Sequence, residues 1–209
     1  MLSRSHPTGF VEPCLPTLSS TVPDGPRWAY EVKHDGFRFI ARRDRDRVRV
    51  FSRNAKDWTD KVPAIAEAML ALPVQSATID GEGAVVDALG LTDFERLRAV
   101  LARRGPHQAF LFAFDLLALD GEDLRKLPLS MRKANLERLL RGRPDGIYVN
   151  PFETGAIGPD LFWAACRMGL EGLVSKRADR PYRGGRSKDW IKVKNRDHHA
   201  FDRVRESYT

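Results

Sequence analysis

The sequence predicts an α+β protein in which antiparallel or mixed β-sheets are flanked by helices. Strand-like runs rich in β-branched and aromatic residues alternate along the 209 residues with segments of helical periodicity. Several neighbouring strand-like runs are joined by links of hairpin length, which a doubly wound parallel sheet does not use. Hydrophobic residues make up 42% of the chain and charged residues 30%, a composition typical of a globular domain rather than a disordered chain.

The residue pattern of the chain changes at Trp28, from a proline-rich segment to strand-like runs. Residues 1–27 carry five prolines and little periodicity, so we expect an extended arm lying on the domain. Three strand-like runs follow, at Trp28–Lys33, Phe37–Arg43 and Val48–Arg53. The polar residues 44–47 form a hairpin connection between the last two runs. We expect the three strands to form an antiparallel meander.

Four segments combine helical spacing with residues that begin or end helices: Val62–Leu72, Thr92–Arg104, Ser130–Arg141 and Gly158–Met168. Thr92 and Glu95 have the form of a capping box, and Gly105 is expected to end that helix. Ser130 is the expected N-terminal cap of the third helix. All four helices are of the length found in globular domains.

The other strand-like runs are Ser76–Asp80, Gly83–Asp87, Ala109–Leu119, Ile147–Phe152, Gly172–Arg177 and Trp190–Lys194. We expect the first two to pair around a tight turn at Gly81. Asp120 and Gly121 predict a turn after the third run. A loop rich in glycine and arginine separates the last two runs.

The net charge of +7 fits a polyanionic partner such as nucleic acid or a nucleotide, although many basic proteins bind neither. Cys14 and Cys166 are far apart and form no C-x-x-C pair, so a disulfide framework and a zinc site are not expected. The N-terminus lacks the apolar core of a signal peptide. The most apolar run, at 109–119, is interrupted by Asp115 and is too short to span a bilayer. We expect a cytoplasmic protein with no membrane partner.

Lys33 is the first candidate for chemistry. It lies near a predicted strand end, is followed by Asp35 and Gly36, and Arg38 comes two residues later. A lysine in such a place is a candidate nucleophile if its surroundings lower the pKa of its amine. Alone, this pattern of four positions is weak evidence.

Four further clusters strengthen the assignment of Lys33 as a nucleophile: Ser52–Asn54, Asp80–Glu82, Glu171–Arg177 and Trp190–Lys194. Strand alternation places Lys192 and Lys194 on one face. Each cluster has an ordinary structural explanation, such as a surface turn, a loop start or a solvated strand face. Together they supply carboxylates for a divalent metal and cations for phosphates, which are the groups needed to handle a nucleoside triphosphate.

In these positions the chain resembles the adenylation domain of ATP-dependent DNA ligases, in the covalent nucleotidyltransferase superfamily. It is most similar to the ligase module of bacterial end-joining ligases. The K-x-D-G-x-R, S-R-N, D-G-E, aromatic-Asp, E-G-x-V-x-K and W-x-K-x-K motifs of the family occur in order between about Phe10 and Asn195. Ala55 stands where the family usually has glycine. The resemblance implies an ATP-grasp-like ligase adenylation fold with its nucleotide pocket between sheets.

The resemblance also implies a reaction. Lys33 would attack the α-phosphate of ATP, form lysyl-AMP and release pyrophosphate, with Mg²⁺ or Mn²⁺ as the metal. The AMP would pass to the 5′-phosphate of nicked or broken double-stranded DNA, and a 3′-hydroxyl would then displace it. This is nick sealing or end joining in DNA repair.

The residues implied to bind ATP or AMP are Glu31, Lys33, Arg38, Arg53, Glu82, Phe114, Glu171, Lys192 and Lys194. Glu31 would read the adenine and Phe114 would stack on it. Glu82 and Glu171 would bind the metal. His34 alternates with Lys33 along the chain, so we expect its side chain to point away from the site.

The basic residues between the last two predicted strands suit contact with a DNA backbone: Arg177, Arg180, Arg183, Arg186 and Lys188. A solvated loop beside a nucleotide pocket would have the same composition. The two interpretations carry equal weight.

The predicted organisation is an arm at 1–27, an adenylation domain at 28–195 and a tail at 196–209. The tail is too short for the OB-fold domain that follows in family ligases, so a separate OB-fold domain or an end-joining protein is an expected partner. We expect the protein to act at the bacterial nucleoid. Two alternatives remain: an RNA ligase or capping-type nucleotidyltransferase, and a non-catalytic DNA-binding accessory of the same fold.

Overall fold

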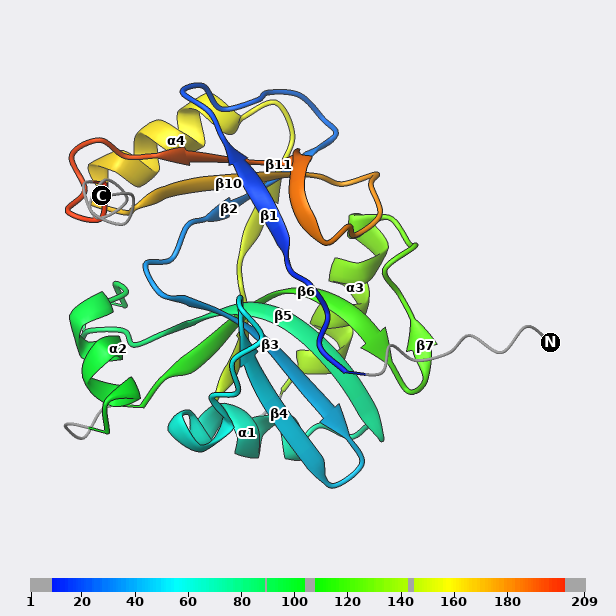
Figure 1. The fold of residues 1–209 in the computed structure, drawn as a ribbon. Helices are drawn as coiled ribbons and strands as arrows, with labels where there is room; N and C mark the ends of the chain where they lie inside the picture. Colours follow the sequence, from blue (N-terminus) through cyan, green and yellow to red (C-terminus); the bar gives the residue numbers. More distant parts are fainter. Residues whose placement is uncertain (1–8, 89, 104–107, 143–144, 202–209) are drawn as a thin grey trace.

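The computed structural model describes residues 9–88, 90–103, 108–142 and 145–201. Within these ranges the chain forms two β-sheets and four α-helices (Figure 1). The first sheet has the order β1 (Cys14–Leu18), β11 (Gly185–Lys194), β10 (Gly172–Arg177), β2 (Trp28–Val32) and β9 (Phe152–Thr154). Its neighbouring strands are antiparallel except for the parallel pair of β1 and β11.

The second sheet has the order β4 (Arg47–Ser52), β3 (Phe37–Asp44), β5 (Ser76–Ala84), β6 (Phe110–Leu119) and β7 (Glu122–Asp123). A further strand, β8 (Ile147–Val149), pairs with β6 in the parallel direction. The mixed and antiparallel pairing confirms the predicted α+β class.

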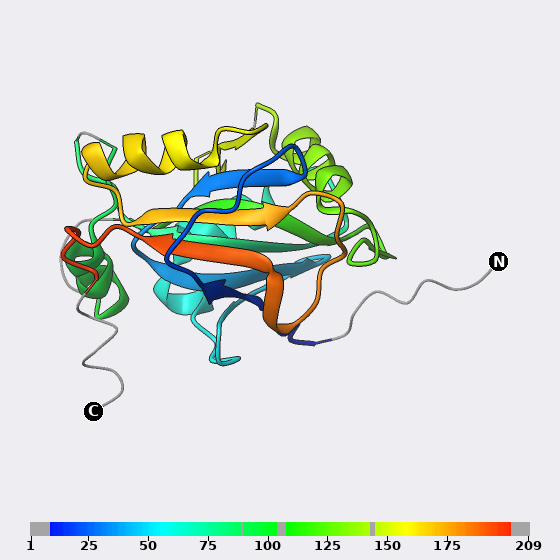
Figure 2. The same cartoon turned by 90° about the horizontal axis from the view of Figure 1, so that it is seen from above.

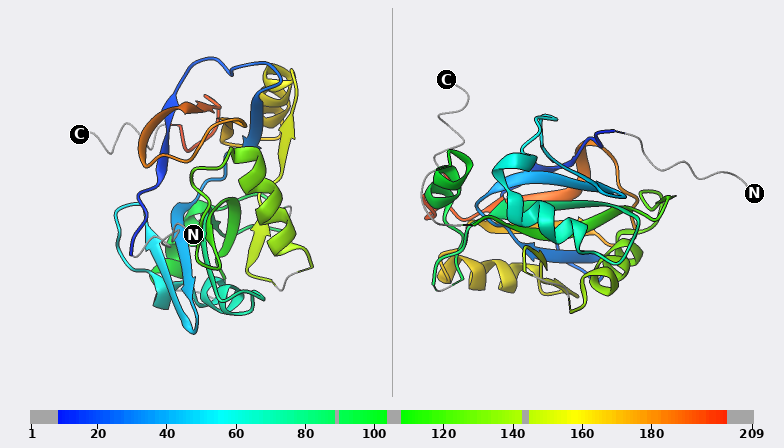
Figure 3. Two further views of the ribbon diagram at one scale, coloured as in Figure 1. Left: turned by 90° about the vertical axis from the view of Figure 1, so that its right-hand side faces the viewer. Right: turned by 90° about the horizontal axis from the view of Figure 1, so that it is seen from below.

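The helices are α1 (Pro63–Leu70), α2 (Phe94–Leu101), α3 (Leu129–Leu140) and α4 (Gly158–Arg167), and a 3₁₀ turn at Thr59–Lys61 precedes α1. Seen from above, α4 lies along the outer side of the first sheet (Figure 2). From below, α1 covers the second sheet (Figure 3). Among the described helices, none combines the length and apolar character needed to cross a bilayer.

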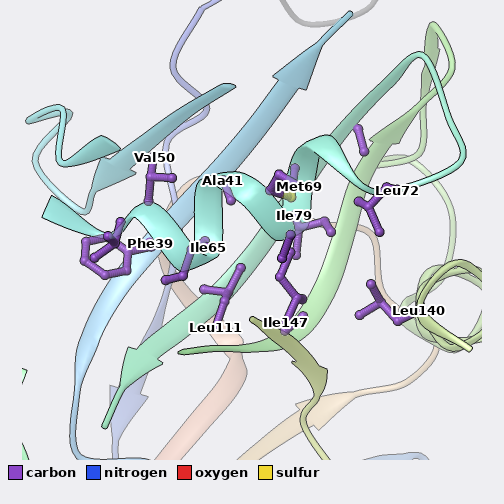
Figure 4. Packing of buried hydrophobic residues seen from close by; sticks show 14 of the residues in the cluster. Phe39, Ala41, Val50, Ile65, Met69, Leu72, Ile79, Leu111, Leu140 and Ile147 are labelled. Carbon is purple, nitrogen blue, oxygen red and sulfur yellow. The ribbon is translucent and has the colours of Figure 1, made fainter. Parts of the chain in front are cut away.

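The larger core lies between the second sheet and its helices (Figure 4). Strand alternation in β3 directs Phe39 and Ala41 into this core, where they pack with Ile65 and Met69 of α1. The other face of the same strand belongs to a smaller cluster, which includes Ile40. The face of β3 and β5 that is turned away from the larger core is therefore available to a site.

The predicted meander is wrong for its first strand. β3 and β4 pair as an antiparallel hairpin, but β2 lies in the other sheet. Residues 33–36 carry the chain from one sheet to the other. Gly36 allows this crossing, because a Cβ atom there would lie 2.3 Å from the carbonyl oxygen of Gly83. Local sequence predicted the strands, but their assignment to sheets depends on tertiary packing.

The predicted strand pair around Gly81 is also wrong. β5 is one continuous strand of nine residues, and Asp80, Gly81 and Glu82 lie within it. A Cβ atom on Gly81 would lie 2.8 Å from the carbonyl oxygen of Phe112, so glycine is needed for close packing rather than for a turn. As a consequence, Asp80 and Glu82 point to the same face of the sheet.

The run predicted as one strand at Ile147–Phe152 is divided between the sheets. β8 pairs with β6 in the second sheet, and β9 pairs with β2 in the first. Asn150 lies at the crossing, where its backbone N–H donates to the carbonyl oxygen of Ala113 at 2.7 Å. Two crossings, at 33–36 and at Asn150, thus bring the sheets together.

Two helix caps differ from the predictions. Asp93, not Thr92, caps α2, and its side chain accepts from the Arg96 N–H at 3.0 Å. Thr92 instead accepts from the backbone N–H of Asp35 at 3.1 Å, which holds the 33–36 crossing. Pro128 takes the cap position of α3 in place of Ser130. The predicted helix end at Gly105 lies outside the described residues.

The proline-rich arm contributes a strand to the first sheet. Cys14–Leu18 forms β1 at the sheet edge, where a missing proline N–H is tolerated. The register against β11 shifts between Pro16 and Thr17. Residues 1–8 and 202–209, which belong to the predicted arm and tail, lie outside the described residues.

Candidate active site between the two sheets

The two sheets enclose a pocket of about 220 Å³ that is lined by residues from both. In β10, strand alternation directs Val174 and Lys176 to the pocket, whereas β2 contributes the consecutive residues Glu31 and Val32, and β5 contributes Glu82. Phe114 of β6 completes this part of the wall. Of the nine predicted nucleotide-binding residues, the pocket lining contains seven: Glu31, Lys33, Arg38, Arg53, Glu82, Phe114 and Lys192.

Glu171 and Lys194 are the two predicted residues that do not line the pocket, but both connect to Lys33. The Lys33 ammonium donates to Glu171 Oε2 at 2.7 Å, and Lys194 Nζ lies 3.2 Å from Oε1 of the same carboxylate. Burial acts to raise the pKa of Glu171, but the two ammonium groups outweigh it and hold the pKa below its usual range. Glu171 is therefore a buried anion that orients the candidate nucleophile.

Cations gather at this end of the pocket. Burial lowers the pKa of Lys192, and the nearby positive charges of Lys33, Lys194 and Arg186 lower it further. Like charges this close favour an anion between them. The Lys33 end of the pocket is thus suited to phosphate groups.

Glu82 faces the same region. Burial raises the pKa of Glu82 to about 7, with Lys33 and Arg38 opposing the rise and Glu171 adding to it. Two carboxylates that repel each other beside a phosphate-binding end provide the hard oxygen ligands preferred by Mg²⁺ and Mn²⁺. The donors are thus of the type that a divalent metal takes, and in this structure Lys33 and Lys194 occupy both oxygens of Glu171.

The opposite end of the pocket has a buried ionic cluster around Glu31. Lys176 donates to Glu31 Oε2 at 2.7 Å, and Asn150 Nδ2 donates to the same oxygen at 3.1 Å. Lys133 of α3 lies 2.6 Å from Oε1. Burial lowers the pKa of Lys176 to about 8, in spite of its ion pair with Glu31. This end offers the buried Glu31 carboxylate as an acceptor and the buried Lys176 ammonium as a donor.

Aromatic rings lie beside this cluster. Phe114 is 6% exposed and packs edge-on against Trp190, with ring centroids 6.0 Å apart. The guanidinium of Arg38 lies 4.3 Å from the centroid of the Phe114 ring. The pocket therefore combines an aromatic surface and buried polar groups with a cationic end.

Arg38 is held by Asp80, a pairing that the sequence did not predict. Its guanidinium donates to both oxygens of Asp80, with one contact at 2.6 Å. The Tyr182 hydroxyl donates to Asp80 at 2.6 Å and accepts from the Cys14 N–H at 2.8 Å. Asp80, rather than a phosphate, is the anion that fixes Arg38 in this structure.

His34 does not point away from the site, contrary to the prediction. It lines the pocket, stacks on Phe112 at a centroid distance of 4.3 Å and bonds to Asn150 Oδ1 at 2.8 Å. β2 ends at Val32, so strand alternation does not govern the next residues. Burial lowers the pKa of His34, which favours the neutral ring.

The predicted DNA-binding residues occupy different positions. Arg177 ends β10 and pairs with Asp179 at 2.9 Å, whereas Arg183 is exposed on the following loop. Arg186 and Lys188 belong to β11, and Arg186 also lines the pocket. Arg180 lies 3.7 Å from Asp189. Arg186 is the member of this group that lines the pocket, and the binding of the group to DNA stays a prediction.

Sequence reasoning missed Lys133 and Asn150 as contributors to the site, and it named Asp80 without its role in holding Arg38. A signal for Lys133 does exist. The buried stripe of α3 contains Leu129, Arg132, Lys133 and Leu136, so two cations occupy positions that helical spacing assigns to the core. Buried cations require partners, which here are Asp115 and Glu31.

The fold and the pocket define a nucleotidyltransferase of the DNA ligase type. A family model described as an ATP dependent DNA ligase domain matches residues 15–194, and the chain belongs to this family. It is 39% identical over 189 residues to the multifunctional non-homologous end joining protein LigD of Pseudomonas aeruginosa. It is 38% identical over 181 residues to a probable DNA ligase of Beutenbergia cavernae.

These matches cover 90% and 83% of this chain but only 22% and 35% of the two relatives, so the chain spans about a fifth to a third of their length. Among solved structures, the chain is similar to mycobacterial DNA ligase D complexed with ATP and MES, with a TM-score of 0.76 and 30% identity. The ligase domain of M. tuberculosis LigD gives a TM-score of 0.74 and 32% identity. Both similarities cover 88% of this chain and 60% of the other, and they confirm the predicted ligase-domain fold.

Proposed function

We propose that this chain is the catalytic adenylation domain of an ATP-dependent DNA ligase, with Lys33 as the residue that becomes covalently linked to AMP. The observation that carries the proposal is the position of the Lys33 amine. It lies in the pocket wall, 2.7 Å from a buried carboxylate and beside further lysines. A nucleotide in the pocket would present its phosphates to this amine.

The chemistry of the two ends supports one orientation for ATP. Phe114 offers an aromatic surface for the base, while Glu31 accepts and Lys176 donates hydrogen bonds at its edge. Lys192 lines the other end and Lys194 pairs with Glu171 beside it, and both would bind the phosphates. Arg38 and Arg53 line the wall between the sheets and would contact the ribose or a phosphate.

In the first step, the Lys33 nitrogen forms a bond to the α-phosphorus, and the bond from that phosphorus to the pyrophosphate oxygen breaks. Lys33 must give up a proton to solvent to act as a nucleophile, and the Glu171 carboxylate, which accepts from it at 2.7 Å, orients its amine. Lys192 would compensate the charge that develops on the phosphate oxygens. The products are lysyl-AMP and pyrophosphate.

Glu82 and Glu171 would hold Mg²⁺ or Mn²⁺. When bound, the ion supplies positive charge to the phosphates during transfer. Glu82 has to be ionised to bind it, and the pKa of about 7 permits this at and above neutral pH.

The AMP would then pass to the 5′-phosphate of nicked or broken double-stranded DNA. Arg186 in the pocket lining and the exposed Arg183 and Lys188 support this proposal, because they would bind the DNA backbone. The relative from Pseudomonas aeruginosa is named for non-homologous end joining, and we propose the same setting, on bacterial chromosomal DNA in the cytoplasm. A separate OB-fold domain or an end-joining protein would act with residues 28–195 in sealing.

Incubation with α-labelled nucleotide tests the proposal. With Mg²⁺ or Mn²⁺, ATP but not GTP should label the protein, and added nicked DNA with a 5′-phosphate should take up the label. A preference for GTP, or for RNA ends, would assign the chain to a capping-type enzyme or an RNA ligase. A protein that stays unlabelled with ATP, metal and DNA would be a non-catalytic accessory.

A further inference from the structure

Lys133 is a buried lysine that lies behind the pocket rather than in its wall. It comes from α3, its side chain is 2% exposed, and it does not line the pocket. Its ammonium contacts three groups: Glu31 Oε1 at 2.6 Å, the carbonyl oxygen of Phe114 at 3.3 Å, and the ring of Phe152 at 4.2 Å. Lys133 therefore touches both the acceptor group and the backbone of the aromatic surface at one end of the pocket.

Two lysines on one buried carboxylate need a physical reason. Glu31 is 2% exposed and Lys176 is 1% exposed, so one lysine already neutralises the glutamate. A second buried ammonium adds a desolvation cost and repels the first. The repulsion is visible in the lowered pKa of Lys176, to which burial contributes most and Lys133 contributes as well.

The reason lies in the different positions of the two lysines. Lys176 lines the pocket, and its ammonium lies 3.8 Å from the centroid of the Phe114 ring. A base that stacks on this ring would compete with Glu31 for the hydrogens of Lys176. Without a second cation, Asn150 would be the one donor left to Glu31 within the described part of the chain, and a buried carboxylate with so few partners is destabilising.

We propose that Lys133 is a positioning residue for base selection, which keeps the Glu31 carboxylate charged and oriented while Lys176 turns to the base. This rests on the proposed function, since it assigns the Glu31 end of the pocket to a purine base. Lys133 acts from outside the pocket, so a bound base does not displace it. Its bond to the Phe114 carbonyl oxygen fixes the acceptor group relative to the aromatic surface. An adenine has an amino group for Glu31 and a ring nitrogen for Lys176, whereas a guanine reverses these roles.

Equilibrium binding of ATP and GTP tests this inference. Titration calorimetry is carried out with metal chelated, so that no covalent step occurs. Wild type should bind ATP more tightly than GTP. Lys133→Met should lose on the order of tenfold in ATP affinity, with a smaller loss for GTP, because Glu31 is no longer held as an acceptor. Lys133→Arg, which keeps the charge, should restore most of the preference.

Two controls separate positioning from general damage. Arg138→Met removes an exposed cation from the same helix and should bind as wild type does. The double variant Glu31→Gln with Lys133→Met should be no weaker than Glu31→Gln alone, because Lys133 acts through Glu31. If a thermal melt shows Lys133→Met to be unfolded, Lys133→Gln takes its place.

The inference is overturned if the Lys133 variant keeps the ATP to GTP ratio of wild type, if the two losses in the double variant simply add, or if wild type shows no preference between the bases. Failure of the proposed function has a different signature. A protein that binds ATP selectively but never acquires label at Lys33 would contradict the adenylation step and leave the role of Lys133 intact.

Discussion

Glu82 is the residue at which protonation and stability are most directly coupled. Its carboxyl group has an ordinary pKa of 4.5 and a folded-state pKa of about 7, chiefly because of burial. Between these values the folded protein holds a proton that the unfolded chain has released. The contribution of Glu82 to stability therefore falls as pH rises from 4.5 to about 7 and stays at its low value above that.

Replacing Glu82 by Gln should consequently stabilise the metal-free and nucleotide-free protein more at about pH 8 than at about pH 5. We expect the gain in the free energy of unfolding caused by Glu82→Gln to be about 1–3 kcal/mol larger at about pH 8 than at about pH 5. This range allows for the partial exposure of the side chain. Urea denaturation at the two pH values measures it. Glu122→Gln, on exposed strand β7, is the control. A Glu82→Gln effect that is the same at both pH values would contradict the raised pKa.

At the scale of single residues, motif resemblance found the groups that meet at the pocket but not the groups that hold them. Lys33, Glu82 and Lys192 stand in recognisable patterns. Lys133 and Asp80 act through contacts with residues more than 40 positions away in sequence, and no local pattern specifies such contacts. The His34 prediction failed because alternation was extended beyond the last residue of β2.

Among the elements, α3 depends most on buried charge. Arg132 and Asp115 are both 0% exposed, and the guanidinium donates to the two carboxylate oxygens at 2.7 and 2.9 Å. The pair joins α3 to β6, the strand that carries Phe114. Arg132 Nη1 also donates to the carbonyl oxygen of Arg180 at 3.1 Å, which ties the basic loop to the same helix.

Arg132→Met should lower the free energy of unfolding by about 3–5 kcal/mol, because it leaves the Asp115 carboxylate buried without its counter-ion. Chemical denaturation followed by circular dichroism measures the loss. Arg138→Met on the exposed face of α3 should change stability by less than about 0.5 kcal/mol. If the two variants are equally stable, the buried Arg132–Asp115 pair does not stabilise the contact between α3 and β6.

The elements themselves were largely predictable, and their partners were not. Helical spacing located α1 and α4 to within two residues, and apolar patterning located β6. The D-G-E segment was misassigned because glycine in a strand and glycine in a turn look the same in one sequence. Ile147–Phe152 was read as one strand because its apolar pattern is continuous, although the chain changes sheet at Asn150.

For the molecule as a whole, the two crossings between sheets explain why residues far apart in sequence form one pocket. Exposed basic residues lie on the loop and strand that follow β10, and Arg186 among them lines the pocket, in a chain of net charge +7. Charge of this kind predicts binding to DNA that weakens with salt, since bound phosphates release counterions.

Arg183→Ala and Lys188→Ala should each weaken binding to nicked DNA and reduce the slope of log affinity against log salt by about 1. Fluorescence anisotropy across a salt series gives the slope. Arg47→Ala, an exposed arginine in the β3–β4 hairpin, should leave the slope unchanged. Equal effects at all three positions would mean that net charge, and not this surface, governs binding.

The central claim is that Lys33 accepts AMP, and peptide mapping by mass spectrometry tests it most directly. Wild-type protein is incubated with ATP and Mg²⁺ or Mn²⁺, digested and analysed next to Lys33→Ala and Lys192→Ala. We predict one AMP group per chain, located on Lys33, absent from Lys33→Ala and formed more slowly in Lys192→Ala. AMP on another residue, or no AMP on the folded wild-type protein even with DNA present, would contradict the account.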